Sequence, residues 1–267
     1  AHPLIEPDTP PFLINQHLEA IAMHNDPETM ANVASQNTGV DDAVGRVLAA
    51  LDKRGLADST LVIFSSDQGN FYGQHGLWQH TVVTRPSNLY EAAINIPLVI
   101  RHPGGIEAGT VSKSVIGQYD IPVTILDYLS VDASFMDSPG RSFAGILRGE
   151  SARWENETFF EQEESRGVRT TRFAYWSRLA GTGEDQLYDM QADPDQHKNL
   201  AGDPAYRDTI NELNNRLSAF FERYADPKYD LWRGGTAKGS VVRPQTFRTI
   251  YGPEWRPKTE MLPPFRE

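Results

Sequence analysis

Two oxygen-bearing side chains stand next to each other directly after a short apolar run. The run covers residues 61–64, and the loop behind it reads Ser-Ser-Asp-Gln-Gly over 65–69. The carboxylate of Asp67 and the carboxamide of Gln68 offer hard oxygens, which suit Ca²⁺ or Mg²⁺. Because Ca²⁺ takes about six to eight oxygens, this pair can supply only part of a shell. The same residues are also typical of a plain Asx turn that ends in glycine. Spacing alone therefore does not decide between a cation site and a turn.

A glycine-rich stretch with two histidines follows the pair. Residues 73–80 read Gly-Gln-His-Gly-Leu-Trp-Gln-His and end at His80, and Tyr90-Glu91 then leads into a second apolar run at 97–100. A histidine can donate a hydrogen bond to an anion, with full charge only if the anion raises its pKa. From residue type alone, however, His80 is interpreted as a loop histidine that faces solvent.

These segments, in this order, resemble the sulfatases of the alkaline phosphatase superfamily. The family pattern has a buried strand, Ser-Asp-(His/Asn/Gln)-Gly, Gly-Glu-His-Gly-x-Trp-x-Lys, Tyr-Glu and then a strand that begins Pro-Leu. Further matches lie at 139–143, 168–170 and 187–204. The resemblance covers about residues 30 to 225, and so many ordered matches make chance a poor explanation.

The resemblance implies a role for each matched site residue. Asp67 and Gln68 fall where sulfatases hold a Ca²⁺ beside the sulfate, with Mg²⁺ as the alternative. His80 falls where the family usually has a lysine that contacts the sulfate oxygens, which is a departure from the pattern. His2 lies near the family's Pro-His-x-Pro segment, whose histidine is a candidate for protonating the leaving oxygen. A loop histidine without a catalytic role is the alternative for His2.

The nucleophile that the resemblance implies has no counterpart in this sequence. In the family it is a formylglycine made from Cys or Ser in a Cys/Ser-x-Pro/Ala-x-Arg motif. The chain has no cysteine, and Ser-Pro-Gly-Arg at 138–141 has its Pro and Arg each one position too early. Since Ala1 is also not an initiator Met, we expect a C-terminal portion of a sulfatase. Its nucleophile and remaining metal ligands would lie on a missing N-terminal segment, and the chain alone would be inactive.

The implied activity is hydrolysis of a sulfate monoester, such as a sulfated carbohydrate. The formylglycine hydrate would attack sulfur, a histidine would protonate the leaving alcohol, and sulfate would be eliminated. One alternative is a phosphonate monoester or phosphodiester hydrolase of the same superfamily. Another is a non-catalytic module that keeps the sulfatase scaffold. The family also suggests a periplasmic or secreted location.

The net charge and the composition argue against several classes of binding partner and metal site. The 25 basic and 36 acidic residues give a formal charge of −11, which argues against nucleic acid or an anionic membrane surface as a partner. No segment approaches the roughly 18 consecutive apolar residues of a spanning helix, so no membrane span is expected. The absence of cysteine excludes disulfides, thiolate metal sites and iron–sulfur clusters within the chain.

The elements that must position the candidate residues alternate between strand and helix in the first part of the chain. A proline-rich loop is expected over 1–39, and apolar spacing with Gly55 as a stop predicts a helix over 40–54. The near-continuous apolar runs at 61–64 and 97–100 predict strands buried on both faces of a parallel sheet. Residues 120–129 predict a helix with Asp120 at its N-cap. This alternation indicates an α/β layer.

After residue 149 the pattern changes to half-buried strands. Segments 157–161, 167–179 and 186–190 predict an antiparallel meander, and 206–224 an amphipathic helix that could cover it. The acidic run at 161–164 is expected to be a solvated edge. The predicted architecture is therefore α/β in two parts. Residues 1–150 would be part of an alkaline-phosphatase-like sandwich with a mostly parallel sheet, and 151–267 a smaller α+β subdomain with an antiparallel sheet, a packed helix and an extended tail.

Overall fold

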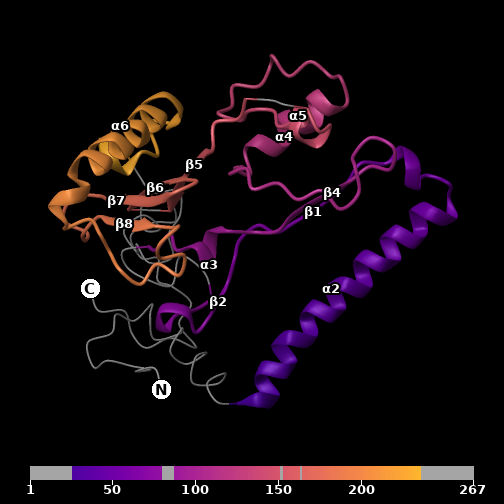
Figure 1. Cartoon of the computed structure of the whole chain (residues 1–267), viewed down its shortest axis with the longest axis horizontal. Helices are drawn as coiled ribbons and strands as arrows, with labels where there is room; N and C mark the ends of the chain where they lie inside the picture. The colour runs from indigo at the N-terminus through magenta and orange to yellow at the C-terminus, as the bar shows by residue number, and fades with distance from the viewer. Residues whose placement is uncertain (1–25, 80–86, 151–152, 163, 236–267) are drawn as a thin grey trace, which may run out of the picture.

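A computed structural model describes residues 26–79, 87–150, 153–162 and 164–235 of the chain (Figure 1). Within these ranges the helices are α2 (Pro27–Lys53), α3 (Glu91–Ile94), α4 (Asp120–Tyr128), α5 (Ala144–Leu147) and α6 (Arg207–Tyr224). The short 3-10 helices are η1 (Ala57–Ser59), η2 (Gln74–Gly76), η4 (Pro204–Tyr206) and η5 (Leu231–Arg233). The strands are β1 (Val62–Ser65), β2 (Phe71–Tyr72), β3 (Trp78–Gln79), β4 (Leu98–Arg101), β5 (Glu157–Gln162), β6 (Ser165–Thr170), β7 (Phe173–Arg178) and β8 (Gln186–Asp189).

The best-packed part of the described chain is an antiparallel sheet in the order β5-β6-β7-β8. Helix α6 covers one of its faces and buries Leu213, Leu217 and Phe221 (Figure 1). The strands contribute Val168, Tyr175 and Leu187 to the same core. The antiparallel sheet and its covering helix are as predicted from residues 157–224. The segment 167–179, however, is not one strand, because it contains most of β6 and all of β7, which pair with each other across a turn at 171–172.

The opposite face of this sheet is also covered, which the half-buried pattern did not predict. Alternate residues of β7 and β8, among them Trp176 and Tyr188, form a second core with Leu89. Successive side chains of a strand point to opposite faces. Both faces of the β6-β7-β8 part therefore lie against protein, one against α6 and the other against the segment that leads into α3.

The strands β1 and β4 pair with each other, but they run antiparallel, with Ile63 opposite Ile100. The sequence placed both strands in a mostly parallel sheet without naming their partners, and this one pairing is antiparallel. Continuous hydrophobicity reports burial and carries no information about the direction of a neighbouring strand. Even the burial is incomplete within the described part of the chain, since Phe64 is 39% and Val99 59% exposed.

Helix α2 begins much earlier than the sequence pattern suggested. Its C-terminal end at Lys53 is as predicted, with Gly55 at a φ of +66° behind it. The part of the predicted loop from Pro27 onward is helical instead. The Asp26 side chain accepts a hydrogen bond from the Glu28 N–H at 3.2 Å, and Pro27 occupies the first turn. Weak apolar periodicity hid this start, although Asp-Pro is a capping signal.

Two further local predictions need correction. Asp120 is the first residue of α4 and Tyr119 its N-cap, but the Asp120 carboxylate still accepts from the N–H groups of Gly117 and Arg141, each at 2.8 Å. Glu164, expected at a solvated edge, is only 2% exposed and accepts from the Ser87 N–H at 3.1 Å. A buried carboxylate with a hydrogen-bond donor is stable where an unpartnered one would not be.

The segment after α6, predicted to be an extended tail, begins with the short helix η5, whose N-cap Asp230 contacts the sheet. Asp230 is buried and pairs with Arg166 of β6 at 2.7 Å. Residues 236–267 lie outside the described part. Across the helices that the structure describes, none is both long and apolar enough to cross a bilayer.

Candidate active site

The loop that carries Asp67 and Gln68 begins where β1 ends, and side-chain hydrogen bonds hold its backbone. The Ser65 hydroxyl donates to the Pro97 carbonyl at 2.9 Å, which ties the loop to the start of β4. The Ser66 hydroxyl donates to the Gln68 carbonyl at 2.8 Å, and the Gln118 side-chain amide donates to the Ser66 carbonyl at 2.7 Å. The loop is therefore held locally and from the segment just before α4.

Gly69 lets the loop rest directly on α3. Its N–H donates to the Ala93 carbonyl at 2.9 Å. A Cβ at this position would lie 2.2 Å from the Ala92 carbonyl oxygen, a distance that real Cβ atoms do not reach. The glycine of the Asp-Gln-Gly sequence is thus required by a close backbone approach.

The side chains of Asp67 and Gln68 are exposed, and their oxygens remain available to a ligand. Among the described residues, Asp67 Oδ1 accepts one hydrogen bond, a long one of 3.4 Å from the Ser66 hydroxyl. An anionic and a neutral oxygen donor on a loop fixed by Gly69 fit two positions of a calcium or magnesium shell. The described residues contain no group of three or more His, Cys, Asp or Glu side chains that could hold a metal by themselves. The pair therefore fits a partial shell only.

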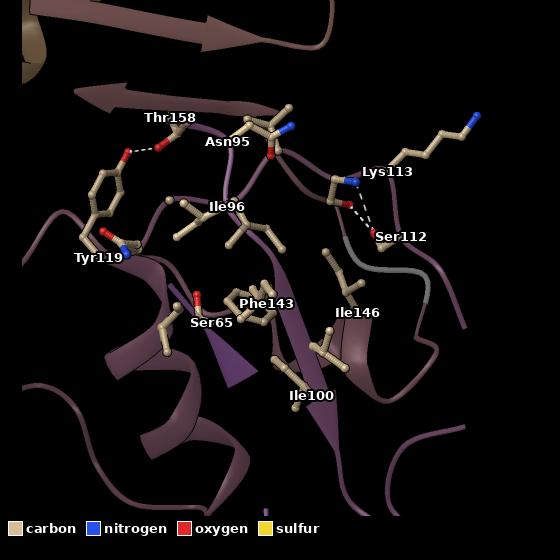
Figure 2. A pocket seen from close by; sticks show the side chains of 18 of the residues that line it. Ser65, Asn95, Ile96, Ile100, Ser112, Lys113, Tyr119, Phe143, Ile146 and Thr158 are labelled. Atoms are coloured by element: carbon tan, nitrogen blue, oxygen red, sulfur yellow. Dashed lines mark hydrogen bonds between the residues drawn. The ribbon is translucent and has the colours of Figure 1, made fainter. Parts of the chain in front are cut away.

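Asp67 and Gln68 are among the residues that line a cleft of about 1320 Å³. Figure 2 shows part of this lining. Figure 2 shows apolar side chains, among them Ile96, Phe143 and Ile146, between Ser112 on one side and the Tyr119 hydroxyl, which meets Thr158, on the other. The Lys113 side chain points away from the cleft. The Thr158 hydroxyl donates to the Tyr119 oxygen at 3.0 Å. Among the polar side chains that line the cleft are Asp67, Gln68, Glu91, Gln118 and Arg169.

His75, in the glycine-rich stretch, has a packing role in this structure. It adopts a φ of 55° and stacks on Tyr90 with ring centroids 3.8 Å apart. Burial lowers its pKa, His197 lowers it further by repulsion, and the carboxylates of Asp193 and Asp195 act in the opposite direction. The stacked imidazole packs against Tyr90 and so supports the position of the glycine-rich stretch.

Two of the four predicted site residues can be placed, and two cannot. Asp67 and Gln68 lie side by side as the sequence required, while His80 and His2 lie outside the described residues. Sequence reasoning missed Gln118 and Arg169. Gln118 is 52 residues from Ser66 and no local pattern marks it. Arg169 lies within the matched segment 168–170, which marked it as part of a motif but gave it no role.

Comparisons with known proteins identify the family of this chain. The family described as Sulfatase matches residues 4–131, and the family described as N-sulphoglucosamine sulphohydrolase, C-terminal, matches residues 73–223. An N-acetylglucosamine-6-O-sulfatase of Bacteroides thetaiotaomicron is 31% identical over 199 residues, which cover 70% of this chain and 34% of that protein. A Delta 4,5-hexuronate-2-O-sulfatase of the same organism is 30% identical over 198 residues, which cover 70% of this chain and 40% of that protein.

A solved structure gives the same result. A protein in complex with its substrate D-glucosamine-2-N,6-O-disulfate is similar with a TM-score of 0.61 and 30% identity, over 70% of this chain and 40% of that one. These matches define a protein of the alkaline phosphatase superfamily. Within it, the chain belongs to the sulfatase family. The chain spans only about a third to two fifths of the length of these two curated relatives.

Proposed function

We propose that these residues contribute to a sulfatase that hydrolyses a sulfate ester of a carbohydrate. Family membership supports the reaction class. The substrate class is supported by the names of two relatives, one an N-acetylglucosamine-6-O-sulfatase and the other a hexuronate-2-O-sulfatase. Because the chain spans only part of its relatives, the activity is that of the whole protein to which this chain contributes.

The observation that carries this proposal is the exposed Asp67–Gln68 pair on a loop fixed from two sides. Asp67 would give one anionic oxygen and Gln68 one neutral oxygen to Ca²⁺, or alternatively to Mg²⁺. A bound cation would neutralise charge on the sulfate oxygens and on the nucleophile. Gln118 and the Ala93 carbonyl hold the loop backbone in place before substrate arrives, so little reorganisation is needed when charge develops.

The remaining parts of the machinery are proposed from the family pattern. His80 would donate a hydrogen bond to a sulfate oxygen in place of the usual lysine, and His2 would protonate the leaving oxygen. The formylglycine nucleophile would come from a segment outside this chain. We further propose that residues 1–150 complete a sandwich with a mostly parallel sheet, that 151–267 form the smaller subdomain, and that the protein is periplasmic or secreted.

The test is sulfate release by the whole protein, with 4-nitrophenyl sulfate and glucosamine-6-sulfate as substrates. Asp67→Ala removes the anionic ligand, so kcat/KM should fall about 100-fold or more, since the cation would no longer be held against the sulfate. Glu184→Ala is the matched control, because Glu184 is an exposed acid outside the site. It should leave kcat/KM unchanged.

Two experimental outcomes would contradict the proposed sulfatase activity and favour another function. Faster turnover of a phosphonate monoester than of either sulfate ester would favour the phosphonate hydrolase alternative. If calcium leaves the melting temperature unchanged and Asp67→Ala costs no activity, the chain belongs to a non-catalytic module on a sulfatase scaffold.

A further inference from the structure

The one-turn helix α3 touches both the Asp67–Gln68 loop and the β5–β8 sheet. In Figure 1 it lies at the junction between the paired strands β1 and β4 and that sheet. On the loop side, the Ala93 carbonyl accepts the Gly69 N–H, and Ala92 leaves no space for a side chain at Gly69. On the sheet side, Leu89 and Tyr90 pack against the core that contains Trp176 and Tyr188. A displacement of α3 must therefore move the loop.

An ion pair joins Glu91, the first residue of α3, to the sheet. Arg169 on β6 donates through Nε to Oε1 of Glu91, and its Nη1 donates to the Thr170 carbonyl. The two paired side chains are only 19% and 21% exposed. An Arg–carboxylate pair shielded from water in this way is stronger than one on the surface.

A second contact holds the backbone of the same residue. The buried side chain of Gln196 accepts the Glu91 N–H at 2.7 Å. A helix of one turn has too few internal hydrogen bonds to be stable alone. Its position therefore depends on these two contacts, one from Arg169 of β6 to the Glu91 side chain and one from Gln196, in the segment after β8, to the Glu91 backbone.

We propose that Arg169 is a positioning residue for the Asp67–Gln68 pair and acts on it through Glu91, α3 and Gly69. The proposal rests on the proposed function, in which that pair binds a divalent cation. The ion pair joins residues 78 positions apart, so the smaller sheet subdomain sets the geometry of a loop in the first part of the chain. Loss of the pair would let α3 shift, and the tight contact at Gly69 would pass the shift to both ligands.

The first test is calcium binding, measured by titration calorimetry of Ca²⁺ alone into the metal-free whole protein. Arg169→Gln should weaken the affinity about tenfold, as expected when an outer partner no longer orients a ligand. Arg169→Lys keeps a positive charge beside Glu91 and should recover part of that loss. Arg172→Gln is the matched control, because Arg172 pairs with Asp189 of the same sheet at 2.8 Å and has no link to α3. It should bind Ca²⁺ like the wild-type protein.

The second test needs neither metal nor activity. Hydrogen exchange of the Gly69 amide reports directly whether the loop still rests on Ala93. In the metal-free protein we expect this amide to exchange about tenfold faster in Arg169→Gln than in the wild type, and at the wild-type rate in Arg172→Gln. If Arg169→Gln fails to fold, the same comparison is made with Arg169→Lys, which should exchange at an intermediate rate.

The outcomes separate this inference from the proposed function. If the wild-type protein does not bind Ca²⁺, or Asp67→Ala binds it equally well, the proposed metal site is wrong and the inference falls with it. If the wild-type protein binds Ca²⁺ through Asp67 but Arg169→Gln shows the same affinity and the same Gly69 exchange, only the positioning role is overturned.

Discussion

At the scale of single residues, the candidate site depends on Gly69 as much as on its ligands. The sequence marked Gly69 as the end of a turn, which is a local interpretation. The structure shows a second reason why this position must be glycine, because the Ala92 carbonyl oxygen lies where a Cβ atom would be. An oxygen pair on a flexible loop would lose entropy on binding a cation, whereas this loop is already held.

A substitution at Gly69 should therefore be costly although it adds one methyl group. Gly69→Ala forces the loop away from α3, so we expect the free energy of unfolding to fall by about 1–3 kcal/mol and calcium affinity to fall with it. Urea unfolding and calorimetry measure the two effects. Gly202→Ala is the control, since nothing lies within 4 Å of a Cβ built there. Equal stability of both variants would contradict the close approach.

His75 should make stability depend on pH below neutrality. Its pKa is lowered, mainly by burial and then by His197, so the unfolded chain binds this proton more readily than the folded one. The stabilising contribution is present above the unfolded value of about 6.5 and is lost as pH falls through the lower folded value. The free energy of unfolding should therefore decrease from about pH 7 to pH 5.

The variant that tests this is His75→Asn. Asparagine does not titrate and tolerates a φ of 55°, so the decrease between the two pH values should be smaller than in the wild type. Urea unfolding at both pH values gives the comparison. The same decrease in both proteins would show that His75 is not the group responsible.

At the scale of elements, apolar periodicity predicted the helices and strands that carry apolar residues along their whole buried face. Helix α6 begins within one residue of its predicted start, because Leu213, Leu217 and Phe221 recur on one face. The start of α2 was missed for the opposite reason, since its first turns are polar and exposed. The start of α2 was indicated by the capping signal at Asp26 and Pro27 and not by the apolar pattern.

The contact of α6 with the sheet should dominate the stability of this part. Leu217→Ala removes a side chain that is 3% exposed and lies in the core with Val168 and Tyr175, so the free energy of unfolding should fall by about 2–5 kcal/mol. Asn214→Ala changes an exposed residue of the same helix and should alter it by less than about 0.5 kcal/mol. Denaturant unfolding of both variants checks this. A small effect of Leu217→Ala would mean that α6 is not firmly packed.

At the scale of the whole molecule, the described chain has one well-packed body and one open part. The β5–β8 sheet is covered by α6 on one face and by the segment before α3 on the other. By contrast, no described residue of α2 is buried, and apolar side chains of β1 and β4 are exposed. Helix α3 connects the two parts, which is why a residue of the sheet can influence the loop after β1.

The sequence by itself determined the family, the Asp67–Gln68 pair, the meander and the helix over it. Each of these depends on neighbouring residues or on a repeat of two or 3.6 residues, which local backbone geometry imposes. Only the tertiary structure decided that β1 and β4 run antiparallel, that Glu164 is buried and that Arg169 reaches Glu91. These features join residues that are far apart in the chain, and no local spacing records which distant partner a strand, a charge or a loop will meet.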